Sequence, residues 1–478
     1  MIVMKFGGTS VGSPARYQHV ARLVGSFQAR QPVVVVSAMA KTTDWLLTTA
    51  RSLLNSTFAD CSMAESAIAE FRALYQQVVA ETFADPLIRA EVGAIVEKHI
   101  QQLLRLFTGI ELLGELSLRS LDATAAFGEK ISSHLLAGAL REAGFAAQAV
   151  SAEELILTDN AFTHARPNMT ITETRTRAYL LPLIEQGIIP VVTGFIGATD
   201  TGITTTIGRD GSDYSASIIG AALNSEEIWI WKEVDGVMTA DPRMVVGARS
   251  LRRLSYAEAG ELTYFGAKVV HPRAVKPAIE KGIPLYIKNT FNPDFPGTLI
   301  HRPQEETDGV VKAVTSAKNL ALITVSGSDV LTVSRVAARS FEIVARQESN
   351  VYMISHASSG QDLCFVIDLN TMPEVVSSLR QEFGREIERG EIDDIVADSQ
   401  VVIIAVIGAG MRGKPGVSGR VFSILGRKGI NIIAIAQGSS EINVSLVVSQ
   451  QDESAAVRAL HEEFISLNGI SKNMRHLR

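Results

Sequence analysis

The sequence predicts an α/β protein in which a three-layer domain, with a mainly parallel β-sheet between helices, is followed by two small ferredoxin-like (βαββαβ) modules. Two observations predict this. Short apolar, β-branched runs alternate with helical patterns through the first 300 residues, which indicates parallel strands buried on both faces. Beyond them the chain repeats itself at an offset of 81 residues. We expect the large domain at 1–300 and the modules at 318–395 and 400–478, with a strand from 309–317 as a candidate part of the second.

The composition is that of an ordinary globular protein, with 46% hydrophobic and 20% charged residues and a net charge of −6. No basic block is present, which argues against nucleic acid as a partner. Cys61 and Cys364 lie too far apart to suggest a disulfide framework or a metal cluster. No signal peptide and no apolar run of about 18 residues are found. These features predict a cytoplasmic enzyme with no membrane segment and no metal-binding residues of its own.

Five segments of the first domain have the apolar character of buried strands, and they occur in a regular order. Between Leu46 and Leu118 the pattern is almost purely helical, which predicts a helical elaboration outside the sheet. The five strand-like segments are IVMKF at 2–6, VVVVSA at 33–38, IIPVVTGF at 188–195, EIWIW at 227–231 and IPLYIK at 283–288.

Proline, glycine and acidic residues accumulate at 292–309 and predict a domain boundary. In the repeat that follows, each copy reads strand, glycine loop, helix, strand, polar turn and strand. An acidic stretch at 381–398 separates the copies. Identical pairs include Gly327/Gly408, Arg339/Arg420, Phe341/Phe422, Arg346/Arg427, Asn350/Asn431 and Ser358/Ser439. Two copies are too few for a solenoid, so a pair of small modules is the better interpretation.

The first motif with chemical content, KFGGTSVG at 5–12, directly follows the first strand. Paired glycines let backbone N–H groups approach phosphate oxygens, and a helix beginning near Pro14 adds its positive dipole end. The lysine precedes the glycines, so the motif is not a Walker loop. An ordinary strand–turn–helix corner is the alternative. The candidate phosphate ligands are Lys5, Gly7, Gly8, Thr9 and Ser10.

The second motif, GRDGSDYS at 208–215, opens an apolar helix. Ser212 or Asp213 could act simply as a helix cap. Capping does not require Arg209, however, and an arginine in a glycine-bracketed loop suits a two-point contact with a carboxylate.

Three further segments carry charged residues beside predicted strands or helices. FGEK at 127–130 contains Glu129, which would ordinarily be solvated. The charged segment from Lys232 to Arg243 follows a strand, where open α/β sheets bind ligands. FGAK at 265–268 ends in Lys268, which would otherwise pass for a surface residue.

GAGMRG at 408–413 matches the dinucleotide fingerprint G-x-G-x-x-G. That fingerprint requires an acidic residue near the end of the next strand, where this chain has Gln437. A tight loop in a repeated module explains the glycines better, and we reject a NAD site.

Taken together, the motifs closely resemble the aspartate kinases of the amino-acid kinase family, over essentially the whole chain. The repeat resembles the family's two ACT domains, which sense amino acids. The segments that carry the resemblance are KFGGTSVG at Lys5, VVSAM at Val35, FGEK at Phe127, VVTGFIG at Val191, GRDGSDYSA at Gly208 and YFGAKVVHP at Tyr264.

The resemblance implies roles for individual residues. Lys5 and Asp213 are implied as catalytic, with Lys5 neutralising the transferring phosphoryl group. Arg209 would take the α-carboxylate of aspartate, and Glu129 and Asp213 would help hold its ammonium group. The full aspartate set is Ser37, Thr43, Glu129, Phe195, Arg209, Ser212 and Asp213. The nucleotide set is Lys5, Gly7, Gly8, Thr9, Ser10, Lys232, Glu233, Val237, Met238, Arg243 and Lys268.

The implied reaction is ATP-dependent phosphorylation of the aspartate side chain, with Mg²⁺, to give 4-phospho-L-aspartate and ADP. It would begin the pathway to lysine, threonine, methionine or a specialised product such as ectoine. The nucleophilic carboxylate has a pKa of roughly 3.9 and needs no general base. This chain has Asp210 where many relatives have glycine, and Lys232-Glu233 and Met238 where many have a Thr-Asp pair and a tyrosine.

The resemblance also implies an amino-acid effector, threonine or lysine. We expect at least a dimer through the modules, a homodimer or a dimer of dimers, because edge-to-edge pairing satisfies the backbone groups of exposed strand edges. We expect the second module to hold the effector, because the first has Asp329 in its glycine loop, His356 in place of a glutamine and Gly360 in place of a glutamate. The candidate effector residues are Gly408, Met411, Asn431, Ile432, Gln437 and Asn443.

Two rival interpretations stay open at this point. One is a kinase for another carboxylate, such as acetylglutamate or glutamate, although those relatives lack the pairing of KFGGTS with a tandem ACT tail. The other is an inactive amino-acid sensor, against which Lys5, Glu129, Arg209 and Asp213 together argue. No dehydrogenase-like segment follows the repeat within the 478 residues, so a fused homoserine dehydrogenase is not expected.

Overall fold

The computed structural model describes residues 1–55, 62–267, 270–302, 309–327, 333–356 and 362–466. They form two compact units. The N-terminal unit comprises Met1–Val237, Arg252–Tyr256 and Val270–Arg302, and the C-terminal unit comprises Met238–Leu251, Ala257–Val269 and Pro303–Arg478. Two segments of the predicted first domain, 238–251 and the described residues 257–267, thus fold with the C-terminal unit. The bounds predicted for the three domains, 1–300, 318–395 and 400–478, stay a prediction.

The N-terminal unit is built on an eight-stranded sheet in the order β3-β4-β2-β1-β7-β9-β10-β8. All neighbouring strands are parallel except the antiparallel pair β9 and β10, so the predicted mainly parallel sheet is confirmed. A separate pair, β5 (Ile196–Ala198) and β6 (Thr204–Thr206), is antiparallel. The sheet strands are β1 (Ile2–Phe6), β2 (Pro32–Val36), β3 (Ala147–Val150), β4 (Ile189–Thr193), β7 (Glu227–Lys232), β8 (Arg253–Ser255), β9 (Leu285–Asn289) and β10 (Thr298–His301).

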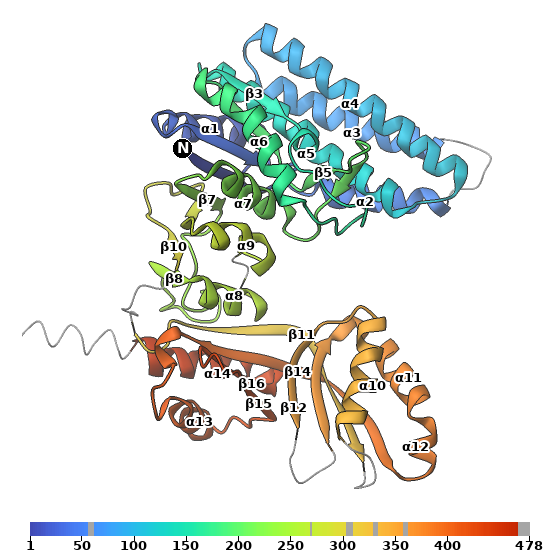
Figure 1. The fold of residues 1–478 in the computed structure, drawn as a ribbon, viewed down its shortest axis with the longest axis vertical. Coiled ribbons are helices and arrows are strands. Elements are labelled where there is room, and N and C mark those ends of the chain that lie inside the picture. Colours follow the sequence, from blue (N-terminus) through green and yellow to red (C-terminus); the bar gives the residue numbers. More distant parts are fainter. Residues whose placement is uncertain (56–61, 268–269, 303–308, 328–332, 357–361, 467–478) are drawn as a thin grey trace, which may run out of the picture. The chain divides into compact units, whose positions relative to one another are not determined.

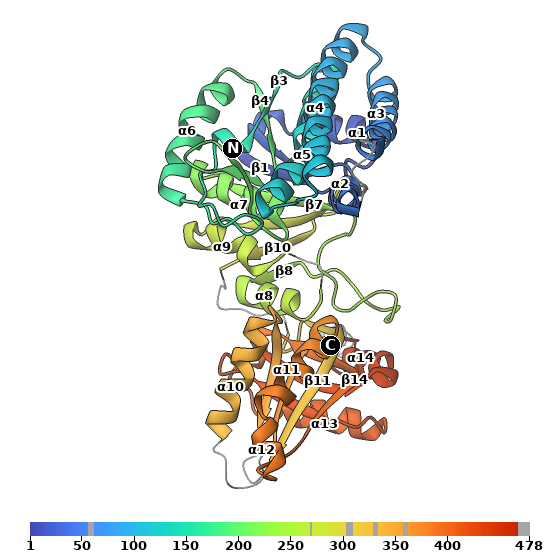
Figure 2. The ribbon, with the colours of Figure 1, turned by 90° about the vertical axis from the view of Figure 1, so that its right-hand side faces the viewer.

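Helices cover both faces of this sheet (Figures 1 and 2). Alternate residues of β1 (Ile2, Met4 and Phe6) belong to a large apolar core shared with helices α1 to α5. Helices α6, α7 and α9 pack as a second group. The helices are α1 (Pro14–Gly25), α2 (Thr42–Ser52), α3 (Ser62–Thr82), α4 (Pro86–Leu113), α5 (Leu118–Glu142), α6 (Met169–Glu185), α7 (Gly211–Leu223) and α9 (Pro272–Lys281).

The predicted helical elaboration corresponds to α2, α3 and α4. Helix α4 shows how the sequence sets its limits. Asp85 caps the helix by accepting hydrogen bonds from the N–H groups of Leu87 and Ile88, with Pro86 at the first helical position, and Gly114 ends it in the left-handed conformation. Strand β10 lies inside the segment predicted to be a domain boundary, so part of that proline- and glycine-rich segment completes the sheet instead.

The C-terminal unit contains a six-stranded antiparallel sheet in the order β12-β13-β11-β14-β16-β15. Its two central strands are long and run through both copies of the repeat. The strands are β11 (Ala313–Gly327), β12 (Val351–His356), β13 (Leu363–Asp368), β14 (Ile392–Ile407), β15 (Ala434–Gln437) and β16 (Asn443–Ser449). The helices are α8 (Tyr256–Tyr264), whose first residue belongs to the N-terminal unit, α10 (Val333–Arg346), α11 (Met372–Glu382), α12 (Gly384–Glu388), α13 (Val417–Arg427) and α14 (Glu453–His461).

The two repeat copies share their central strands. The first part of β11, 313–317, pairs with 403–407 of β14, whereas the second part, 320–327, pairs with 392–401 of β14. Register shifts occur between Ala317 and Leu322. The second module therefore takes its fourth strand from chain that precedes the first module, and each module has its own apolar core.

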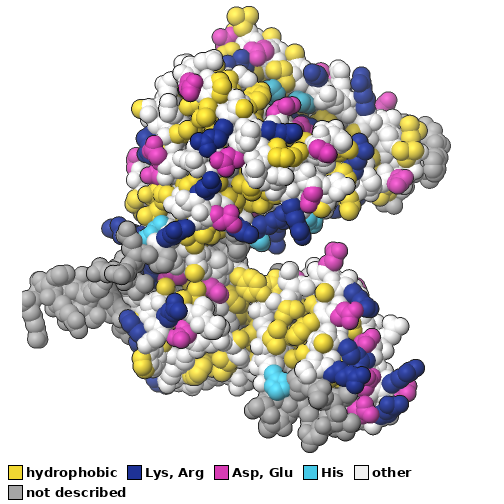
Figure 3. All heavy atoms as spheres, in the orientation of Figure 1, with side chains coloured by type: hydrophobic (Ala, Val, Ile, Leu, Met, Phe, Trp, Pro, Cys, Tyr) yellow, Lys and Arg dark blue, Asp and Glu magenta, His cyan; other side chains and the backbone are white. Residues whose placement is uncertain are grey.

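On the face shown in Figure 3, acidic and basic side chains are interspersed over the described residues of both units. None of the described helices combines the length and the apolar character that crossing a membrane requires.

Candidate active site

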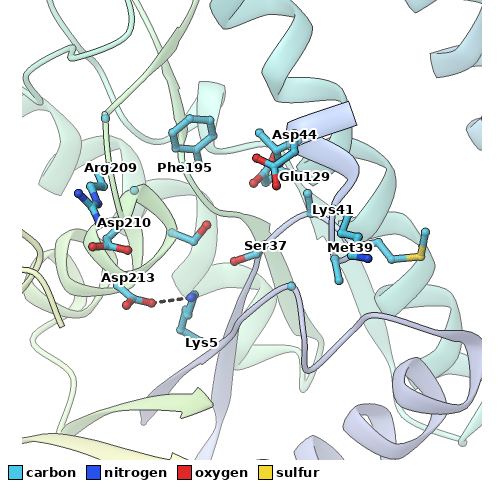
Figure 4. A pocket seen from close by; sticks show the side chains of 17 residues that line it. Lys5, Ser37, Met39, Lys41, Asp44, Glu129, Phe195, Arg209, Asp210 and Asp213 are labelled. Atoms are coloured by element: carbon cyan, nitrogen blue, oxygen red, sulfur yellow. Dashed lines mark ion pairs between the residues drawn. The ribbon is translucent and has the colours of Figure 1, made fainter. Parts of the chain in front are cut away.

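A pocket of about 310 Å³ lies in the N-terminal unit, where the loops after β1 and β2 meet helix α5 and the start of α7 (Figure 4). All seven residues assigned to aspartate line it, together with Lys5 and Gly8. The remaining lining residues are Ala38, Met39, Ala40, Lys41, Asp44, Gly208, Asp210 and Gly211. Segments from five regions of the chain thus converge on one cavity.

Close backbone packing around Ala38 brings these segments together. A Cβ atom added to Gly8 would lie 2.8 Å from the carbonyl oxygen of Ala38, and one added to Gly128 would lie 2.6 Å from its Cβ. Real side chains do not approach so closely, so both positions require glycine. Because Gly128 lets α5 pack against this loop, the next residue, Glu129, lies at the pocket.

Lys5 and Lys232 share a single carboxylate, that of Asp213. Lys5 Nζ lies 2.5 Å from Asp213 Oδ1 and Lys232 Nζ lies 3.5 Å from Oδ2. Burial opposes ionisation, but the charges of Lys5 and Lys232 hold the pKa of Asp213 below its ordinary value. The carboxylate is therefore ionised and fixes two cations at the ends of neighbouring strands β1 and β7. Its predicted role as an ammonium ligand stays a prediction, and its observed contacts are with lysines.

Arg209 and Glu129 lie on opposite sides of the pocket, with Ser37 between them (Figure 4). Among the described residues Arg209 has no ion pair, and Glu129 Oε2 is buried without a hydrogen-bond partner. Burial raises the pKa of Glu129 to about 8, although a backbone hydrogen bond from Ala38 and the charge of Lys5 act in the opposite direction. The cavity thus presents a cation and an unsatisfied carboxyl group to whatever occupies it.

Three non-glycine residues that line the pocket have left-handed backbone conformations. They are Lys41 (φ 67°), Phe195 (φ 68°) and Asp210 (φ 53°). Such conformations are unfavourable for most L-residues and are retained where the surrounding structure enforces them, often at functional sites. Asp210 stands where the resemblance predicts glycine, and aspartate tolerates this conformation better than most residues.

The candidate phosphate loop forms a turn in which the N–H of Ser10 donates to the carbonyl oxygen of Gly7. A Cβ on Gly7 would lie 3.7 Å from Lys5 Nζ, which puts this backbone beside the lysine. The side chain of Ser10 is buried and its hydroxyl pairs with that of Thr290 at 2.8 Å. Thr9 is exposed, and its carbonyl oxygen accepts a hydrogen bond from Arg16.

The other residues assigned to the nucleotide are dispersed in the chain. The N–H of Val237 donates to Thr298 Oγ1, and Glu233 is exposed. Met238 and Arg243 belong to the C-terminal unit, where Arg243 pairs with Asp241 at 2.6 Å. Lys268 lies outside the described residues. The nucleotide roles of these residues stay predictions.

Met39, Lys41 and Asp44 line the pocket but were not predicted as site residues. A signal for them was available, because they continue the chain directly from the VVSAM segment at Val35 into helix α2. Their residue types and their spacing are those of an ordinary helix start. The only signal for them was that they directly follow the VVSAM segment.

In the C-terminal unit, the glycine loop at 408–413 adjoins the turn at 437–443. The N–H of Gly408 donates to the carbonyl oxygen of Ile442, and that of Gly413 donates to Glu441 Oε2 at 2.7 Å. A Cβ on Gly408 would lie 2.5 Å from the carbonyl oxygen of Val310, so the loop requires glycine there.

The six candidate effector residues differ in accessibility. Met411 is buried in the module core and Ile432 packs against it, whereas Asn431 and Gln437 are exposed. Asn443 Nδ2 donates to Glu261 on α8 at 3.0 Å, and its Oδ1 is buried without a partner. Asp329 and Gly360, the two residues expected to alter the first module's effector site, lie outside the described residues, and His356 is exposed at the end of β12.

Comparison with protein families gives two matches that together span most of the chain. Residues 1–289 match the amino acid kinase family, and residues 323–383 and 404–464 match the ACT domain. The second match falls on the two copies of the repeat.

Individual proteins similar to this chain agree with these family matches. The chain is 32% identical to aspartokinase 1 (chloroplastic) of Arabidopsis thaliana, over 98% of this chain and 81% of that protein. It is 35% identical to the bifunctional aspartokinase/homoserine dehydrogenase 2 (chloroplastic) of the same plant, and it spans about half the length of that protein and of the other bifunctional relatives it matches.

Among solved structures, E. coli aspartokinase III in complex with aspartate and ADP (R-state) superposes with a TM-score of 0.79 at 28% identity, covering 97% of this chain and 99% of that one. The same enzyme in complex with lysine and aspartate (T-state) superposes with a TM-score of 0.80 at 27% identity, with the same coverage of both chains. From the family matches, the relatives and the shared fold, the chain belongs to the aspartokinases of the amino acid kinase family.

Proposed function

We propose that the protein transfers the γ-phosphoryl group of ATP to the side-chain carboxylate of L-aspartate, giving 4-phospho-L-aspartate and ADP. The observation that carries this proposal is that Arg209 and Glu129 face one pocket from opposite sides. A zwitterionic amino acid satisfies both groups, because its α-carboxylate suits a guanidinium and its ammonium suits an ionised glutamate. The E. coli relative solved with aspartate and ADP supports the same assignment.

Lys5 is suited to act on the transferring group. The nucleophilic carboxylate is ionised at neutral pH, since its pKa is roughly 3.9, so the obstacle is charge repulsion between the carboxylate and the triphosphate. A fixed ammonium group at the point of transfer lowers this repulsion without reorganising during the reaction. Asp213 holds Lys5 in place, at 2.5 Å, and so acts on the reaction through the lysine.

The nucleotide would bring its phosphates to the glycine turn at 7–10 and to Lys232. The second lysine at 3.5 Å from Asp213 gives this chain two cations on one carboxylate, which suits a phosphate chain carrying several negative charges. Mg²⁺ would enter with ATP, since it is commonly held by substrate phosphates and water with few protein ligands, and it would neutralise phosphate charge.

We further propose that the ACT modules bind an amino-acid effector and join the chains into a homodimer or a dimer of dimers. The lysine complex of the E. coli relative supports an amino-acid effector, and lysine or threonine is the proposed ligand. The dimer is proposed because β12 and β15, the outermost strands of the sheet, carry exposed isoleucines, Ile354 and Ile435. A cytoplasmic location and a place in the aspartate-derived pathway also stay proposals.

A coupled assay of ADP release tests the proposal. L-Aspartate should support steady turnover, whereas L-glutamate should be turned over only at a small fraction of that rate and N-acetyl-L-glutamate not at all. Turnover that depends on either of those two instead would assign the protein to a different carboxylate kinase. No turnover with any of the three, together with calorimetric binding of lysine or threonine, would identify an amino-acid sensor without kinase activity.

A further inference from the structure

Helix α5 carries two buried acidic residues, Asp122 and Glu129, seven positions apart. Two helical turns separate them, so they lie on the same side of the helix. Glu129 faces the pocket, whereas Asp122, 1% exposed, does not line it. A buried carboxylate is costly unless it is well hydrogen-bonded, so the partners of Asp122 indicate its role.

Asp122 binds two segments that are distant in sequence from α5. Its Oδ1 accepts from Thr206 Oγ1 at 2.6 Å, and its Oδ2 accepts from the N–H of Thr206 at 2.9 Å. The same two oxygens accept from the N–H of Thr163, at 3.1 and 2.9 Å. The N–H of Ala165 in turn donates to the carbonyl oxygen of Thr206. One carboxylate therefore ties the end of strand β6 and the turn around Thr163 to helix α5.

Thr163 adopts φ 71°. A β-branched residue rarely occupies the left-handed region, and the conformation persists only where the surroundings enforce it. The bidentate contact between its N–H and Asp122 is one such constraint. The backbone at this point is thus held in a definite position.

Arg209 follows Thr206 by three residues, and the chain between them rests on the same turn. At Gly208, which has φ 85°, an added Cβ would lie 3.4 Å from the ring of His164 and 3.6 Å from the carbonyl oxygen of Thr163. The N–H of Ile207 donates to the carbonyl oxygen of Phe195. The loop that presents Arg209 is therefore seated on the segments that Asp122 holds.

We propose that Asp122 is a positioning residue that fixes the Arg209 loop relative to Glu129 and thereby sets substrate selectivity. The proposal rests on the proposed function, in which these two groups grip the α-carboxylate and the ammonium of aspartate. With the head of the substrate fixed at two points, the side chain extends a set distance toward Lys5. A substrate that is one methylene longer places its carboxylate wrongly, and a loosened grip reduces this discrimination.

Matched variants of strand β6 test the proposal. Thr206→Val removes the hydroxyl contact with Asp122. Thr205→Val removes an equally buried hydroxyl contact from the adjacent residue, whose Oγ1 lies 2.7 Å from that of Thr158. Thr206→Ser keeps the hydroxyl, and Asp122→Asn keeps the shape of the carboxyl group but removes its charge. Each variant is compared with the wild type for its Michaelis constants, its aspartate-to-glutamate ratio of kcat/KM and its melting temperature.

Thr206→Val and Asp122→Asn should raise the KM for aspartate about tenfold or more, the scale set by a lost hydrogen bond to a charged group, and lower the aspartate-to-glutamate ratio. Their KM for ATP should stay near the wild-type value. Thr205→Val should lower the melting temperature to a similar degree without moving the KM or the ratio, and Thr206→Ser should resemble the wild type. If Asp122→Asn does not fold, the comparison of Thr206→Val with Thr206→Ser and Thr205→Val decides whether the inference holds.

Two results would overturn the inference: an unchanged aspartate KM and ratio in both Thr206→Val and Asp122→Asn, or the same change in Thr205→Val as in Thr206→Val. Either would leave Asp122 with a purely structural role. These outcomes are distinct from failure of the proposed function, which would show as absence of aspartate-dependent ADP release in the wild-type protein.

Discussion

Lys5 Nζ lies 2.5 Å from Asp213 Oδ1, and both side chains are almost fully buried. Lys232 approaches the other oxygen of the same carboxylate. This geometry makes Lys5 a preorganised positive charge, because its position does not depend on the substrate. The contribution of the lysine to the reaction can therefore be separated from its contribution to binding.

Lys5→Ala should lower turnover on the order of 10²-fold or more, because a charge that acts on the transferring group is lost. The fold should be retained, because Lys232 remains as a partner for Asp213. Steady-state kinetics with a melting curve check both parts. A kcat close to that of the wild type would remove Lys5 from the mechanism.

Arg209→Lys should raise the KM for aspartate far more than the KM for ATP. Lysine keeps the charge but cannot make the planar two-point contact with a carboxylate. The ATP Michaelis constant, measured at saturating aspartate, is the internal control. Equal increases in both constants would assign Arg209 to the nucleotide or to the fold.

Glu129 makes stability depend on pH in a predictable direction. Burial raises its pKa from 4.5 to about 8, so between these values the folded protein holds a proton that the unfolded chain releases. The free energy of unfolding therefore falls as pH rises through this range. Glu129→Gln cannot titrate, so its stability relative to the wild type should increase from pH 4.5 to about 8 and then level off. Denaturant titrations at several pH values measure the difference, and a constant difference would contradict the raised pKa.

Aspartate binding should release a proton from Glu129. The substrate ammonium favours the ionised carboxylate, whereas the empty site at pH 7 holds mostly the protonated form, given a pKa of about 8. The KM for aspartate should accordingly fall as pH rises toward 8. Calorimetry in two buffers of different ionisation enthalpy counts the protons. Release that persists in Glu129→Gln would place the titrating group elsewhere.

The two ACT modules should differ in effector binding. Gln437→Ala should weaken binding of lysine or threonine about tenfold or more if its amide contacts a charged group of the effector, whereas His356→Ala should change it little. Calorimetric titration of the full chain gives both numbers. Two equivalent sites per chain, lost equally in the two variants, would show that the modules have kept the same ligand.

Association through the C-terminal unit should depend on its outer strands. Ile435→Lys should weaken dimerisation, because charged side chains discourage edge strands from pairing. Ile435 is 43% exposed on β15. Leu87→Lys, at an 81% exposed position of α4, is the matched control. Light scattering at micromolar concentration reports the mass. A monomeric wild-type protein would refute the expected dimer.

Continuous apolar runs predicted strands β1, β2, β4, β7 and β9 correctly, because strands buried on both faces carry no polar interruption. The short strands β5 and β6 were missed, since three residues each, Ile-Gly-Ala and Thr-Thr-Thr, are too few to form such a run. Strand β10 was missed because proline and glycine around it resemble a linker. Local sequence thus predicts long buried strands well and short or peripheral ones poorly.

The seven residues assigned to aspartate were predicted from the resemblance of the motifs, and the structure brings all of them to one pocket, while their roles stay predictions. Asp122 was not identified. A single acid in a helix ordinarily indicates a solvated face, and its partner Thr206 lies 84 positions away. For the same reason the sequence did not reveal that Glu258 of α8 forms a buried ion pair with Lys312 at 3.0 Å in the C-terminal unit. Pairings across such distances depend on the completed fold.

The exchange of strands between the two ACT modules constrains how this sensor can change in evolution. Because the second module takes the strand at 313–317 from chain that precedes the first module, a recombination event that cut the chain between the copies would leave the second copy without that strand. The duplicated unit must therefore be gained, lost or transferred whole. The surfaces of the two modules can still diverge by point substitution, but the two modules are inherited together.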